Sequence, residues 1–102
     1  MANIATIGST SMGHPPYPPS TATGGSSNVM AEGAGVHRVG DSWSLHGNPM
    51  SPLEPPHSGT TITGSNTVFC NGFGIARLGD SIQCGPGVDT IGTGKATIMV
   101  GG

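Results

Sequence analysis

Three histidines and one cysteine are the residues of this chain whose types and spacing could do chemistry. They are His14, His46, His57 and Cys84. Two of the histidines follow a glycine by six residues and the cysteine follows one by five, at Gly8, Gly40 and Gly79. Zn²⁺ accepts imidazole nitrogen and thiolate sulfur, and three histidines with one cysteine fill a tetrahedral site without leaving a position for a catalytic water. These residue types predict one structural zinc ion.

An internal duplication places three of these residues, His14, His46 and Cys84, at nearly equivalent points, and His57, on the proline-rich insertion, can supply a fourth ligand. Shifting the chain by thirty-nine residues lays the segment that begins at Gly25 over the segment that begins at Gly64, and both segments contain Arg-x-Gly-Asp. The second segment predicts a hairpin in which Val68–Cys70 turns through Asn71–Gly72 and returns as Ile75–Leu78, because Asn-Gly accepts positive φ at both turn positions. Each full copy is therefore expected to be a short hairpin.

A third, split copy is predicted from the two ends of the chain. Residues 96–102 resemble Asn66 to Gly72, and residues 4–9 resemble Ile75 to Asp80. If the last strand pairs with the first, the three copies close a ring with pseudo-three-fold symmetry. Such symmetry would gather the ends of three equivalent strands, and with them the candidate ligands, at one end of the axis.

Composition predicts an all-β domain with few or no helices. The chain has 102 residues, of which 19 are Gly and 9 are Pro, and only 8% are charged. Glycine at this density favours short strands and tight turns, and a chain this small and poor in large apolar residues needs a metal, disulfides or a partner for stability. Two cysteines are too few for a disulfide scaffold.

Charge and hydropathy exclude several classes of partner. A net charge of −2 with three basic residues gives no footprint for nucleic acid or an anionic membrane surface. The chain has neither an N-terminal signal pattern nor a segment long enough to span a membrane, so we expect it to be made in the cytoplasm and to stay there, or to leave by another route.

The remaining polar residues favour structural interpretations. The repeated Arg-x-Gly-Asp unit is interpreted as a salt-bridged turn rather than as an adhesive or catalytic charge pair. His37 is expected at the surface or facing a subunit, because it alternates away from the end of its strand. Cys70 is interpreted as a small buried hydrophobe.

Six apolar residues are divided between a thin core and an exposed flat patch, on the face opposite the metal. They are Val29, Met30, Val68, Phe69, Ile98 and Met99. A chain with three repeat units around one axis can meet a true trimer face to face, so this patch is expected to dock one copy of the chain on a trimer.

The duplicated segments resemble a known family. Gly35–Asp41 and Gly74–Asp80 are similar to the Pro-Ala-Ala-Arg-Val-Gly-Asp signature of PAAR-repeat proteins, and Val68–Gly72 resembles a strand of that family. The resemblance covers nearly the whole chain and implies a small cone. Its sharp apex is pinned by one zinc ion on three histidines and one cysteine, which matches the site inferred above. Residues 1–102 would be a single PAAR-repeat domain with no effector extension.

The sequence leaves two functions open, one implied by the family resemblance and one that shares only the repeat. The family implies a non-enzymatic, membrane-piercing tip that caps the trimeric β-helical spike of a type VI secretion system or a contractile phage tail. It would be made in the bacterial cytoplasm and would touch the target envelope transiently. The resemblance does not decide whether an effector docks on it. The alternative is a free-standing zinc metalloprotein with hydrolytic activity, which would need an open coordination position and a general base.

Overall fold

The computed structural model describes residues 1–102 except 15, 16, 52, 54 and 86. That part of the chain contains nine short strands and no helix, and therefore no helix that could cross a membrane. The strands are β1 (Ala2–Ile4), β2 (Met30–Ala31), β3 (Ala34–Gly35), β4 (Gly59–Thr61), β5 (Phe69–Cys70), β6 (Phe73–Gly74), β7 (Ser81–Cys84), β8 (Gly87–Thr90) and β9 (Lys95–Val100). They pair antiparallel in four small sheets, β1-β9, β2-β3, β4-β7-β8 and β5-β6. The predicted all-β class is confirmed.

The predicted hairpin is formed by β5 and β6. Its turn is Asn71–Gly72, with φ of 53° and 85°, the conformation that the Asn-Gly pair favours. The return strand is shorter than predicted and lies at Phe73–Gly74. The predicted bounds Ile75–Leu78 were wrong: Ile75 still donates its N–H to the carbonyl of Val68 in its own copy, but its bridge is with Arg38 of the first copy.

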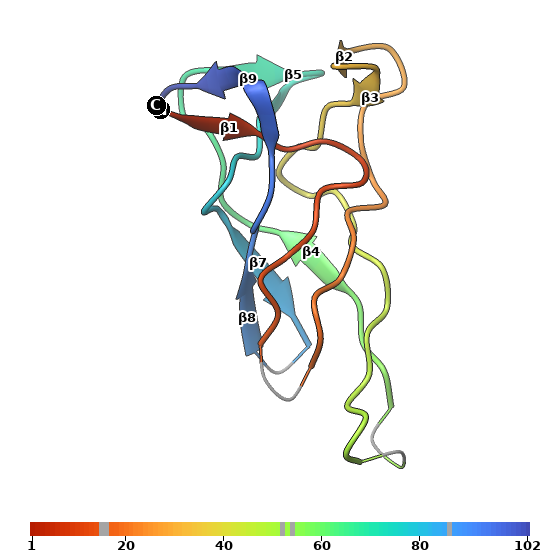
Figure 1. The fold of residues 1–102 in the computed structure, drawn as a ribbon. Coiled ribbons are helices and arrows are strands. Elements are labelled where there is room, and N and C mark those ends of the chain that lie inside the picture. The colour runs from red at the N-terminus through yellow and green to blue at the C-terminus, as the bar shows by residue number, and fades with distance from the viewer. Residues whose placement is uncertain (15–16, 52, 54, 86) are drawn as a thin grey trace.

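The split third copy is present. The strands β1 and β9 pair antiparallel, with Ala2 opposite Val100 and Asn3 opposite Met99, so they form a hairpin without a connecting turn. Figure 1 shows the chain end marked C beside the start of β1, in line with this pairing. The two ends of the chain therefore build the third copy together.

A closed ring of backbone hydrogen bonds defines the pseudo-three-fold axis. The N–H of Ala5 donates to Ala76, that of His37 to Ala5, and that of Ala76 to His37, each at 3.0 Å. A second set of equivalent bonds runs from the N–H groups of three turn glycines to three carbonyl groups, Gly8 to Ala22, Gly40 to Thr61 and Gly79 to Ile91. Each copy thus bonds to its neighbour in the same way.

The core consists of two clusters stacked along an elongated body of 40 × 23 × 23 Å. One cluster contains Ile4, Ala31, Val36, Cys70, Ile75 and Val100. The other contains Ala5, Ala22, Trp43, Ala76, Ile82, Cys84 and Ile91. Cys70 is 4% exposed, so its interpretation as a small buried hydrophobe is confirmed. Figure 1 shows the hairpins of the three copies at one end of the body, with β7 and β8 extending away from it.

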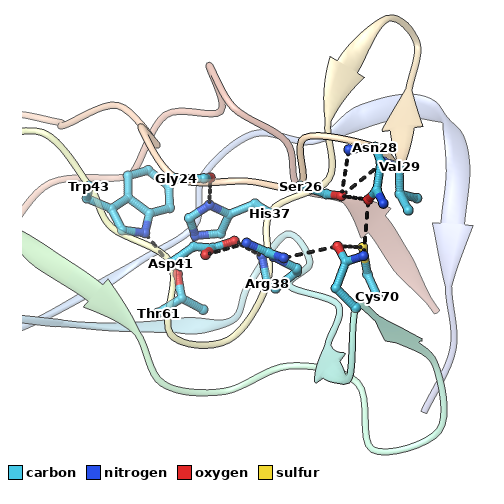
Figure 2. Close-up of polar contacts among 11 residues, drawn as sticks. Gly24, Ser26, Asn28, Val29, His37, Arg38, Asp41, Trp43, Thr61 and Cys70 are labelled. Carbon is cyan, nitrogen blue, oxygen red and sulfur yellow. Dashed lines mark hydrogen bonds and ion pairs between the residues drawn. The ribbon is translucent and has the colours of Figure 1, made fainter.

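The Arg-x-Gly-Asp units are salt-bridged turns, as predicted. Arg38 Nε lies 2.8 Å from Asp41 Oδ2, and Arg77 Nε lies 3.0 Å from Asp80 Oδ2. Each arginine also reaches the hairpin of the next copy: Arg38 Nη1 donates to Asn71 Oδ1 and Arg77 Nη1 to the carbonyl of Gly101. The charge pairs therefore join one copy to the next. Figure 2 shows the first of them.

The hairpin end of the body, which we call the base, carries exposed apolar side chains. Met30, Phe69 and Met99 occupy equivalent places in the three strand pairs and are 57%, 59% and 47% exposed. Val29 and Val68 are 40% and 39% exposed, and Ile98 packs partly on the core. The division predicted for these residues between core and exposed patch is confirmed.

Candidate metal centre

Two of the candidate ligands are held face to face by the backbone. His46 N donates to the carbonyl of His57 at 2.9 Å, and His57 N donates back to His46 at 3.1 Å. This pair of hydrogen bonds closes the proline-rich segment between the two residues. The two residues consequently lie opposite one another in an isolated antiparallel bridge.

The other two candidates sit on tight turns. His14 accepts a hydrogen bond from the N–H of Tyr17 at 2.9 Å. Cys84 ends β7, where it pairs with Gly59 of β4 on one side and with Gly87 of β8 on the other. Gly85 follows with φ of 54°, and a Cβ there would lie 2.7 Å from the ring of His57, so the close approach of the turn to that ring requires glycine.

The four donor atoms converge on one point. The Nε2 atoms of His14 and His46 are 3.2 Å apart, those of His46 and His57 2.9 Å, and those of His57 and His14 3.3 Å. Cys84 Sγ lies 3.0 Å from His46 Nε2, and all four donors lie within 4.8 Å of one another. Zinc–nitrogen bonds of about 2.0–2.1 Å at tetrahedral angles would separate the nitrogens by about 3.3 Å. The spacing therefore fits ligands around one ion.

Hydrogen bonds alone do not account for this cluster. His46 Nδ1 donates to the carbonyl of Pro18 at 2.6 Å, which leaves a lone pair on Nε2. That lone pair faces two other imidazole nitrogens and a sulfur, and it has no proton to offer them. A cation at the centre would satisfy all four donors, and a second-sphere carbonyl that fixes the tautomer is usual for a metal-binding histidine.

Burial shields the cluster from water on most sides. Cys84 is 0% exposed and His46 5%, whereas His14 and His57 are partly exposed. The ring of Tyr17 covers the three imidazoles, with centroids 4.9, 5.3 and 4.3 Å from those of His14, His46 and His57. Burial, with a contribution from the charge of Asp89, raises the pKa of the Cys84 thiol. A divalent cation would reverse that, because a coordinating thiol is deprotonated.

The comparison with known families agrees with the duplicated segments. The family model of the PAAR motif matches residues 53–102, the half of the chain that holds the second copy, His57 and Cys84. The chain is a PAAR-repeat protein. No curated protein matches its sequence. The PAAR family is structural rather than catalytic and is associated with the spike tips of type VI secretion and related systems.

His37 does not lie at the surface, and that prediction was wrong. It is 0% exposed, because its backbone belongs to the hydrogen-bonded ring on the axis. Its Nδ1 lies 2.7 Å from the carbonyl of Gly24 and its Nε2 2.7 Å from Thr61 Oγ1 (Figure 2). Since a carbonyl can only accept, Nδ1–H donates to Gly24 and Nε2 accepts from Thr61. Trp43 Nε1–H donates to Thr61 at 2.8 Å and completes the chain.

The repeat register held a signal for this burial. His37 aligns with Ala76 of the second copy and Ala5 of the third, two small residues of the type that pack on an axis. Thr61 and Trp43 carried no such signal. Thr61 reaches His37 from β4, and Trp43 reaches it from later in the same copy, so both contacts depend on the folded arrangement.

Replacing His37 with alanine should lower stability near neutral pH and flatten its dependence on pH below about 6.5. Burial lowers the pKa of His37 despite its bond to Gly24 and the charge of Asp41; nearby Arg38 adds to the lowering. In the unfolded chain His37 therefore binds a proton near its ordinary pKa, whereas in the folded chain it stays neutral at that pH. As the pH is lowered, the free energy of unfolding therefore decreases by up to about 1.4 kcal/mol per pH unit.

Urea unfolding at about pH 7 and about pH 5.5 measures both effects. The variant should lose about 1–3 kcal/mol near pH 7, because Thr61 and Gly24 lose their partner. Both proteins contain the same metal-site histidines, whose titration cancels in the comparison. Equal pH slopes would contradict the assigned role of His37.

Proposed function

We propose that this protein is the piercing tip that caps and sharpens the trimeric β-helical spike of a contractile injection machine. Its apex is pinned by one zinc ion on His14, His46, His57 and Cys84. The observation that carries the proposal is the division of the body along its axis. Three equivalent apolar hairpins form one end, and four converging donor atoms lie toward the other.

The pseudo-symmetry explains how a single chain can meet a trimer. Met30, Phe69 and Met99 present one apolar side chain from each copy. Each of these can address one subunit of a three-fold symmetric partner, whereas an asymmetric monomer would leave two of three equivalent surfaces mismatched. One copy per trimer follows from this arrangement.

The metal serves stability in this proposal. Three short hairpins without a helix bury little apolar surface, and a structural zinc ion turns binding energy into folding energy. A site with four protein ligands leaves no position for an activated water, so the proposed function includes no hydrolysis. The chain supplies the ligands and the second-sphere carbonyl that orients His46; the ion would supply only a fixed tetrahedral centre.

The mass of the complex with the cognate spike trimer tests this function. We expect one copy of this chain per trimer, measured by native mass spectrometry or light scattering of the purified assembly. Three copies per trimer would contradict the proposal. A stable free homo-oligomer without affinity for a β-helical spike would contradict it as well.

A further inference from the structure

Three equivalent residues form a layer next to the candidate metal centre, one from each copy. The three residues are recognised by the hydrogen bonds from the N–H groups of the turn glycines, which the carbonyl groups of Ala22, Thr61 and Ile91 accept. Two residues before these carbonyl groups lie Ser20, Gly59 and Asp89, respectively. Ser20 and Asp89 are 4% and 2% exposed. The layer is therefore internal, and it differs from copy to copy in chemistry.

Asp89 lies on the same face of its sheet as Cys84. In the β7-β8 pair Asp89 is opposite Ile82, so both side chains point to the buried face, and Cys84 follows Ile82 by two residues on that face. Diagonal neighbours of this kind have Cβ atoms about 7 Å apart or less. Asp89 therefore lies beside Cys84 in the interior of the protein.

The carboxylate of Asp89 is only half satisfied. Its Oδ1 accepts the N–H of Thr90 at 2.7 Å, but Oδ2 is buried and meets no hydrogen-bond donor among the described residues. The hydroxyl of Ser20, in the same layer, is likewise buried without such a partner. A buried carboxylate is costly unless a proton donor or a cation compensates it.

Gly59 packs directly beside the cysteine. A Cβ at this position would lie 2.7 Å from Ile82 Cγ2 and 3.3 Å from Cys84 Sγ, so the third position of the layer has no room for a side chain. Among the three positions of the layer, only Asp89 can therefore carry a charge.

We propose that Asp89 is the counter-charge of the metal centre and raises its affinity for a divalent cation. A dication bound by one thiolate and three neutral imidazoles carries a net charge of +1, and one buried carboxylate beside it brings the sum to zero. This inference rests on the proposed function, because it requires the four ligands to hold the ion. Asp89 does not bind the ion; it acts through the field at Cys84 and at the ion.

Zinc affinity of purified proteins, measured by competition with a chromogenic chelator, tests the proposal. Asp89→Asn keeps the shape and removes the charge, and it should weaken zinc binding about 10–100-fold, the usual cost of losing an outer-shell partner. Asp89→Ser should weaken it similarly, and Ser20 shows that serine fits this layer. Glu32→Gln, an equal change of charge on an exposed side chain of the β2-β3 turn, should leave the affinity unchanged.

A second measurement does not depend on metal affinity. Without zinc, Asp89→Asn and Asp89→Ser should melt at or above the wild-type temperature, since each removes an uncompensated buried charge; with zinc, they should melt below it. Folded variants whose zinc affinity stays within twofold of wild type would overturn the inference while leaving the four-ligand site intact. A wild-type protein that binds no zinc would instead overturn the proposed function.

Discussion

Proteins carrying Cys84→Ala or His46→Ala should contain no stoichiometric zinc and should melt about 20 °C or more below the wild type. Both side chains are buried, at 0% and 5% exposure, and each contributes one of four converging donors. Removal of either leaves three ligands and a buried gap. The loss is large because a structural zinc ion supplies several kcal/mol of folding free energy, and 1 kcal/mol shifts the melting temperature of a domain of this size by about 4–8 °C.

Metal content by mass spectrometry and melting by circular dichroism measure this outcome. His37→Ala is the matched control, because it also removes a buried imidazole but lies outside the cluster; it should retain one zinc ion per chain. Chelator should lower the melting temperature of wild type and His37→Ala alike, and that of Cys84→Ala hardly at all. Unchanged zinc stoichiometry in the two ligand variants would refute the site.

A single carboxylate placed in the base should strongly weaken binding to the spike trimer and leave the zinc content unchanged. Phe69→Asp and Met30→Asp each put a charge on a side chain that is more than half exposed in the free protein and would be covered by the spike. Burying an unpaired charge at the centre of an apolar interface costs about 2–4 kcal/mol, so affinity should fall by at least about 30-fold. The fold should tolerate both changes.

Binding of the immobilised spike trimer to each variant measures the loss. Leu53→Asp is the control, since Leu53 is 96% exposed in the proline-rich segment between His46 and His57, away from the base. It should dock like the wild type, and all three variants should keep their zinc. Docking that is unaffected by the base variants, or lost in Leu53→Asp, would place the interface elsewhere.

Local and periodic features of the sequence predicted most of the fold. The repeat at a shift of thirty-nine residues can be recognised in the sequence alone. The turn at Asn71–Gly72 could be predicted because few residue pairs accept two positive φ angles. Three of the four candidate ligands, His14, His46 and Cys84, could be named in advance because their spacing follows the repeat. His57 lies on the proline-rich insertion and was predicted as the fourth ligand by its residue type. Their convergence is a consequence of the axis, which the repeat also implied.

The failures lie where one copy meets another. Ile75 forms its bridge with Arg38 of the first copy, and His37 is buried against Thr61 of β4 and Trp43. Neither pairing is encoded in a local pattern. The half-satisfied carboxylate of Asp89 could not be predicted for the same reason, since an acidic residue between Val88 and Thr90 resembles a surface position until its sheet is known.

The pairing of β1 with β9 has a consequence for how the molecule acquires its fold. Ala2 must find Val100 across almost the whole chain, and closing a flexible loop of that length costs about 4 kcal/mol in entropy. Contacts so distant in sequence slow folding, because the chain is ordered before they stabilise it. During synthesis the first two hairpins can emerge and pair, but the ring stays open until β9 leaves the ribosome. The hairpin of β1 and β9, one third of the base, is therefore the last to form. An unfinished chain would have only two of the three apolar hairpins that the base presents.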